Sequence, residues 1–158
     1  MEKTIDVKKV YDDLSKKHKL PRFNELDKEI RLNELEKTRE EYLLYYIRLR
    51  LGEKLSFFAN ILDSCIHPLS QTFVVMHESK SFKEDDKKSM MEMLGKTMGL
   101  LRENILLYTT TTEKEDADYI NRVMKEIPSI KKEVDRVAKI LKESWSKEEE
   151  SDTENYFG

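Results

Sequence analysis

A long run of apolar residues at helical spacing, from Asn33 to Ile66, constrains this fold more than any other feature of the chain. Such residues, spaced three or four positions apart, lie on one face of an α-helix. We therefore predict a helix from about residue 34 to 66 with this stripe facing the core. The stripe consists of Leu43, Ile47, Leu51, Leu55, Phe58, Leu62 and Cys65. The face is widened by Tyr42, Tyr45, Tyr46 and Leu49, which predicts contacts on two sides, as for the central helix of a bundle.

The composition favours helices throughout. The chain has only 4 glycines and 3 prolines, while 39% of its residues are charged. This balance is typical of long solvated helices and leaves little material for tight β-turns. We predict an all-α bundle of about five or six helices in a single domain, residues 1–146. In it the long central helix packs against helices at about 83–109 and 113–146.

Shorter elements complete this prediction. Helices are expected at 6–19 and 23–30, with Asn24 as the N-cap of the second, and a short helix or ordered connection at 70–78. Ser81 with Glu84, and Thr112 with Glu115, have the spacing of capping boxes, which begin helices. The buried face of the helix after Ser81 is predicted to be Met90, Leu94, Met98, Leu101, Ile105 and Tyr108.

Gly52 and Pro128 interrupt predicted helices. Gly52 is either simply tolerated or marks a close helix approach or a mild bend. Pro128 either kinks one helix or begins a second one at its first turn, and we favour two segments sharing one face. That face consists of Ile120, Met124, Ile127, Ile130, Val134, Val137, Leu141 and Trp145.

Charge does not favour a nucleic-acid partner. The 29 basic residues are balanced by 32 acidic ones, so the net charge is -3. Basic residues along both long helices alternate with acids, as on an ordinary solvated face. Arg48 and Arg50 are the exceptions, because they interrupt an apolar stretch where each needs either a partner or a path to water.

No residue pattern indicates catalysis or a cofactor. Cys65 and His67 form the closest pair of soft metal ligands, but a second pair for zinc is missing. None of the three histidines follows a glutamate by three positions, as a ferritin-like metal site requires. We expect no catalytic, metal or cofactor site, and a buried Cys65. A single cysteine, a polar N-terminus and no membrane-length apolar run favour a soluble cytoplasmic protein.

Residues 147–158 form an acidic segment that ends in two aromatic residues. We predict that this tail is disordered. Tyr156 and Phe157 could anchor it in a basic-rimmed apolar pocket of a partner. The alternatives are plain disorder and a remnant of a protease-cleavage tag, which ENYFG loosely resembles.

The sequence resembles a small family of uncharacterised archaeal helical proteins. The likeness lies in LPRFNELDKE at 20–29, IRLRLGEKLSFFANILDSCIHP at 47–68, and YINRVMKEIPSIKKEV with ILKESW further on. This family implies a helical fold and no assigned activity. A weaker likeness, YLLYYIRLRLGEKLSFFANIL at 42–62, is to the helical domain of GINS replication subunits, in which such a helix builds subunit interfaces. The small β-domain of that family has no counterpart here, because no strand-rich segment is found.

These observations predict a non-catalytic protein-interaction or scaffold module, acting as an oligomer or within an assembly. A GINS-like replication scaffold or a nucleic-acid-associated helical protein is the alternative. An interaction module should expose an apolar patch beside the tyrosine cluster. The candidate interaction residues are Tyr42, Tyr45, Tyr46, Arg48, Arg50, Tyr156 and Phe157.

Overall fold

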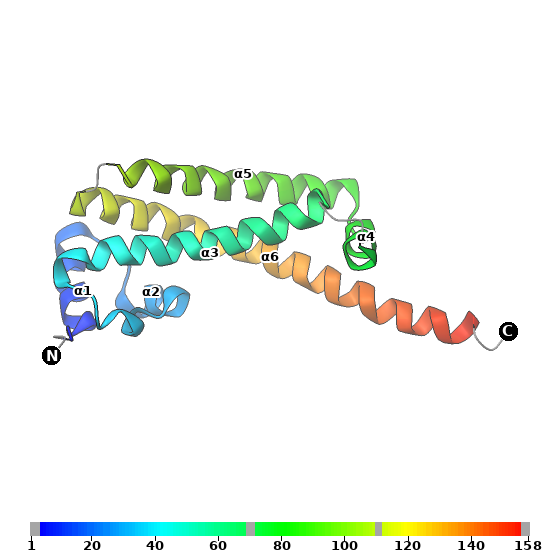
Figure 1. Cartoon of the computed structure of the whole chain (residues 1–158), viewed down its shortest axis with the longest axis horizontal. Coiled ribbons are helices and arrows are strands. Elements are labelled where there is room, and N and C mark those ends of the chain that lie inside the picture. The colour runs from blue at the N-terminus through cyan, green and yellow to red at the C-terminus, as the bar shows by residue number, and fades with distance from the viewer. Residues whose placement is uncertain (1–3, 69–71, 110–111, 156–158) are drawn as a thin grey trace. The chain divides into compact units, whose positions relative to one another are not determined.

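The protein is all-α. A computed structural model describes residues 4–68, 72–109 and 112–155, with side chains up to residue 146 (Figure 1). The described ranges contain six α-helices, two short 3-10 helices and no strand. The predicted all-α bundle with a long central helix is confirmed. The elements are α1 (Val7–His18), α2 (Phe23–Ile30), η1 (Leu32–Leu35), η2 (Glu40–Tyr42), α3 (Leu43–Ile66), α4 (Phe73–Lys80), α5 (Glu84–Leu107) and α6 (Glu113–Asn155).

The chain groups into two compact units. Unit 1 lies within Met1–Phe57 and Gly99–Pro128, and unit 2 within Phe58–Met98 and Ser129–Gly158. Each of the helices α3, α5 and α6 has one part in unit 1 and the other part in unit 2. The predicted single domain over residues 1–146 stays a prediction.

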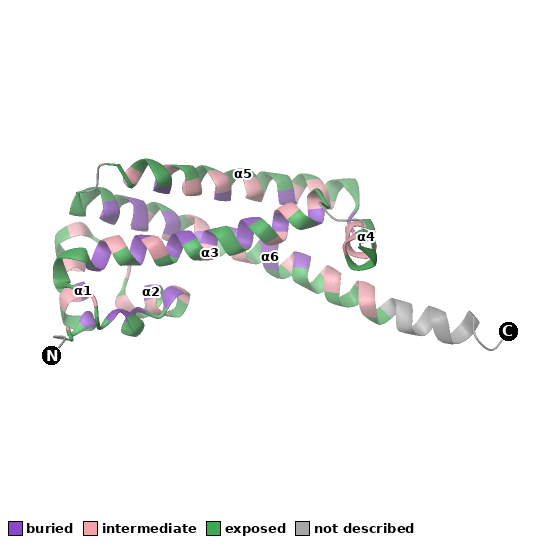
Figure 2. Cartoon of the chain, viewed as in Figure 1, coloured by how far each residue is buried: buried purple, intermediate pink, exposed green. Residues whose placement is uncertain are grey.

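The core stripe of α3 is confirmed. All seven predicted residues, from Leu43 to Cys65, are buried, and Figure 2 shows buried positions along this helix. The helix begins at Leu43, however, and not near residue 34. The intervening segment forms η1 and η2, because long-range contacts hold it there: the Ile5 N–H donates to the Glu36 carbonyl at 2.8 Å, and Leu32 and Leu35 are buried. In unit 1, η1 packs against α1 and α2.

The buried face of α5 differs from the prediction. Met90 is buried, but Ile105 and Tyr108 are exposed. Burial instead recurs every seven residues, at Met90, Thr97 and Asn104. Residues seven positions apart lie on the same side of a helix. The buried face of α5 therefore includes two polar side chains, Thr97 and Asn104. The start of α5 also differs: the Lys83 N–H, not a group of Ser81, donates to Asp86, at 2.9 Å.

Pro128 lies inside a single continuous helix, α6, so the favoured reading of two segments is wrong. A proline within a helix costs about 3 kcal/mol through the missing N–H and the steric clash with the preceding turn. Ile127 and Ile130 are both buried on either side of it, and their burial offsets that cost. The predicted capping box at the start of α6 is confirmed, since Thr112 and Glu115 bond to each other's backbone N–H groups.

The C-terminal segment is assigned in part to α6, which extends over residues 147–155. The predicted disorder of residues 147–158 stays a prediction. No glycine or proline falls between 129 and 155, and glutamate and lysine are good helix formers. The last three residues, including Tyr156 and Phe157, lie outside the described part of the chain.

Unit 2 is held by side chains that join α6 to α4 and α5. Trp145 Nε1 donates to Glu78 Oε1 at 3.0 Å, and the Trp145 ring lies 4.3 Å from that of His77. Arg136 donates to Asp86 on α5 at 2.6 Å and bonds to Glu133, one turn earlier on α6, with two nitrogens. Two nitrogens bound to one carboxylate give a strong, directional contact. These contacts fix the second half of α6 within unit 2.

Candidate interaction surface

Arg48 is completely buried in unit 1, although it carries a charge. It lies on α3 and reaches polar groups of α5 and α6. Its Nε donates to Asp116 Oδ1 at 2.6 Å. Its Nη1 donates to Asn104 Oδ1 at 2.5 Å and to the Asn104 carbonyl at 3.3 Å. A buried charge requires such partners, so three helices are joined at one guanidinium group.

Two tyrosine rings enclose the guanidinium of Arg48. Its central carbon lies 5.1 Å from the ring centroid of Tyr45 and 5.1 Å from that of Tyr108. At this distance a cation is attracted to the face of an aromatic ring. Tyr45 also packs edge-on against Tyr46, with ring centroids 5.4 Å apart. Arg48 therefore contacts two tyrosines that are far apart in sequence, Tyr45 on α3 and Tyr108 just after α5.

These tyrosines reach the molecular surface. The exposed fraction is 48% for Tyr42, 39% for Tyr46 and 58% for Tyr108. We call Tyr42, Tyr45, Tyr46 and Tyr108 the tyrosine surface. Ile105 and Leu106, in the last turn of α5, are exposed as well. Exposed aromatic and large aliphatic side chains of this kind are enriched at protein-binding sites.

Close packing at Gly52 completes the surroundings of Arg48. A Cβ atom built at Gly52 would lie 2.5 Å from Asn104 Nδ2. Only glycine leaves room for this side chain, so the close helix approach is the correct reading of Gly52. The absence of a side chain on α3 thus allows Asn104 to reach Arg48.

The electrostatics of this centre are those of a desolvated ion pair. Burial raises the pKa of Asp116, and the hydrogen bond from Arg48 opposes that rise. The second terminal nitrogen of Arg48, Nη2, has no hydrogen-bond partner in the described part of the chain. The pair is therefore sensitive to the loss of either partner, because the remaining charge would stay buried.

The structure places the predicted interaction residues in different environments. Tyr45 and Tyr46 are in contact on α3, and Tyr42 ends η2 just before it. Arg50 points to water and pairs with Glu53 at 3.2 Å. Arg48 is buried beneath the tyrosines, so it contributes to their position and not to an exposed contact. Arg48 thus has buried partners and Arg50 has a path to water, which are the two arrangements expected for an arginine in an apolar stretch.

Sequence reasoning missed three residues of this site. Asn104 and Asp116 resemble ordinary polar residues of amphipathic helices, and Tyr108 was assigned to the core. A signal was present, because a buried arginine needs an acceptor, but the sequence does not show which of many acidic and amide side chains supplies it.

The cysteine and the histidines do not form a shared site. Cys65 is buried as predicted, and burial raises the pKa of its thiol. His18 lies 2.6 Å from Glu113, and His67 lies 3.3 Å from Asp63. Among the residues that the structure describes, no three His, Cys, Asp or Glu side chains are placed to hold a metal ion.

The fold and this surface define an all-α helical protein whose three long helices meet at a buried arginine beneath exposed tyrosines. No family model, curated protein or solved structure matches the chain. None of the helices in the described ranges combines the length and apolarity needed to cross a bilayer.

Proposed function

We propose that this chain is a non-catalytic protein-interaction module that self-associates through the tyrosine surface. One observation carries the proposal: the buried guanidinium of Arg48 contacts the rings of Tyr45 and Tyr108. Tyr42 and Tyr46, on the same segment as Tyr45, are exposed. Tyrosines held in place lose little conformational entropy on binding, and they are enriched at interface centres.

The charges near the tyrosine surface support a second copy as the partner. Exposed residues of both signs lie on the same segment, among them Arg39, Glu41 and Arg50. A two-fold interface brings the same patch of each copy together, so it requires a surface that is complementary to itself. A mixed set of charges around an apolar centre meets this requirement.

The basic residues favour this role over nucleic-acid binding. Arg50, Lys54 and Arg136, three basic residues of the long helices, are paired with carboxylates. Arg48 is buried. A nucleic-acid site needs a contiguous face of free basic side chains. The GINS-like scaffold remains an alternative form of the same interaction role, and the cytoplasmic location remains part of the proposal.

Site-specific photo-crosslinking in cells tests the interaction role directly. A photoreactive phenylalanine analogue replaces Tyr42 in one variant and Glu92, which is exposed on α5 in unit 2, in a control variant. We expect a crosslinked dimer of the chain from position 42 and none from position 92. A crosslink to another protein would support the interaction role but would show that the partner is not a second copy of this chain. No protein adduct from position 42 would contradict the proposal.

A further inference from the structure

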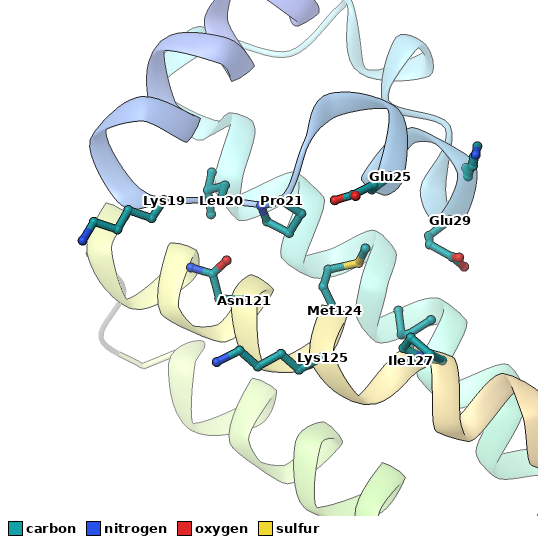
Figure 3. Close-up of a pocket in the computed structure, with 11 residues that line it drawn as sticks. Lys19, Leu20, Pro21, Glu25, Glu29, Asn121, Met124, Lys125 and Ile127 are labelled. Carbon is teal, nitrogen blue, oxygen red and sulfur yellow. The ribbon is translucent and has the colours of Figure 1, made fainter.

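A cleft in unit 1 lies apart from the residues of the tyrosine surface. Its walls are the connection between α1 and α2, α2 itself and the first half of α6 (Figure 3). Its volume is about 520 Å³, within the range of sites for small molecules. The lining residues are Lys19, Leu20, Pro21, Glu25, Lys28, Glu29, Asn121, Met124, Lys125, Ile127 and Pro128.

The floor of the cleft is apolar. Leu20 and Ile127 are buried, and Pro21, Met124 and Pro128 add further apolar surface. The Pro21 carbonyl is already occupied, because it accepts a hydrogen bond of 2.7 Å from the Tyr11 hydroxyl. Methionine adapts its shape to what it contacts. The floor therefore suits the apolar part of a ligand.

The rim of the cleft carries unpaired positive charge. Lys19, Lys28 and Lys125 form no ion pair with a carboxylate among the described residues. The two acids of the lining are already engaged. Glu25 accepts the Arg22 N–H at 3.2 Å, and Glu29 binds Lys54 Nζ at 2.5 Å. Glu25 keeps its charge, but the three lysines outnumber it, so the net charge left to attract a ligand is positive.

The positive groups are not spread evenly. In Figure 3 the side chains of Lys19 and Lys125 extend toward the same side, on which Asn121 lies, while Glu25 and Glu29 lie on the other. Lys19 has a left-handed backbone, with φ at 53°, at the C-cap of α1. Glycine is usual at such a position, and another residue costs about 1 kcal/mol. This backbone places a lysine at the rim.

We propose that this cleft binds an amphipathic small anion, with its carboxylate on the side of Lys19, Asn121 and Lys125 and its apolar body across Pro21, Met124 and Ile127. A nucleotide fits the lining less well. The lining offers no aromatic ring on which a base could stack and no glycine-rich loop for phosphates. This inference is independent of the proposed self-association, because it rests on other residues.

Methyl NMR of the full chain, labelled at its methionine methyl groups, tests the inference. Decanoate, kept below its micelle concentration, is the probe. We expect a saturable shift of the Met124 methyl signal, which the variant Met124→Leu identifies by its loss. The variant K19E/K125E should weaken decanoate binding about tenfold or more, since charge-assisted contacts are lost and reversed. The matched control K132E/K139E makes the same charge change at exposed sites in unit 2 and should bind as the wild type.

Two further probes separate the contribution of the ligand's charge from that of its apolar body. Decyltrimethylammonium has the same chain length with the opposite charge and should bind about tenfold more weakly. Inorganic phosphate, which has no apolar body, should leave the Met124 signal in place. Equal binding of the two decyl compounds, tighter binding of phosphate, an unchanged affinity in K19E/K125E, or no Met124 shift with decanoate would each overturn the inference. Circular dichroism checks that every variant is folded.

Discussion

Arg48 and Asp116 are 68 positions apart in the sequence, yet Arg48 Nε donates to Asp116 Oδ1 at 2.6 Å, and the two side chains are buried. The two residues join α3 to α6, and Arg48 also binds Asn104 on α5. Since the same guanidinium lies between Tyr45 and Tyr108, the pair links the packing of three helices to the position of the exposed tyrosines.

Removing one partner of this pair should strongly destabilise unit 1. We expect R48M to lower the free energy of unfolding by about 3–5 kcal/mol, because Asp116 would be left as a buried charge without its cation. The double variant R48M/D116L should recover part of this loss, since neither charge remains. Urea denaturation followed by circular dichroism measures both. If R48M were as stable as the wild type, the ion pair would not hold these helices together.

Gly52 should be intolerant of alanine, although it lies within a helix. Replacing a helical glycine by alanine usually stabilises by about 0.5–1 kcal/mol. At Gly52 the new methyl group would displace Asn104 from Arg48, so we expect G52A to lower the thermal midpoint.

Gly95 and Gly99 are matched controls on α5. Beyond the adjacent residues and the nearby backbone of α5, no described atom lies within 4 Å of either Cβ position, so G95A and G99A should each raise the thermal midpoint. A rise for all three variants would show that α3 and α5 do not approach closely at Gly52.

Local spacing predicts some of these features and not others. The α3 stripe from Leu43 to Cys65 could be predicted, because apolar burial alone determines it. The face of α5 could not, since Thr97 and Asn104 are buried there, and Asn104 owes its burial to Arg48 on another helix. The start of α3 was misplaced for a similar reason, as the Glu36 carbonyl is bound by Ile5.

The candidate surface was predicted in part. The cluster of Tyr42, Tyr45 and Tyr46 follows from one helical segment, so its members could be found by spacing. Tyr108 follows the last residue of α5, and it is related to Tyr45 through the guanidinium of Arg48, which lies 5.1 Å from each ring centroid. A contact that depends on a shared third residue leaves no periodic signal in the sequence.

Acid should weaken unit 2 through Arg136. The pKa of Asp86 lies below its ordinary value because of hydrogen bonds from the Lys83 backbone and from Arg136, and that of Glu133 is lowered chiefly by Arg136. A carboxyl pKa lowered by folding adds stability above the ordinary value, and this stability is lost as the pH falls through the lowered value. We expect R136Q to cost on the order of 1 kcal/mol at neutral pH and less at about pH 3.

Urea denaturation at both pH values measures this difference. K139Q removes one positive charge from an exposed site on the same helix and serves as the control. It should behave as the wild type at neutral pH. A cost of R136Q that is the same at both pH values would mean that the lowered carboxyl pKa values do not contribute to stability.

Sedimentation velocity over a wide range of protein concentration tests the proposed self-association most directly. The wild type should show a sedimentation coefficient that rises with concentration, and Y46S/Y108S should remain a monomer, because it lacks two exposed rings of the tyrosine surface. The control M76S/M91S removes two methionines of similar exposure in unit 2 and should associate as the wild type does. A wild type that stays monomeric throughout, or a Y46S/Y108S variant that associates equally well, would contradict self-association through the tyrosine surface.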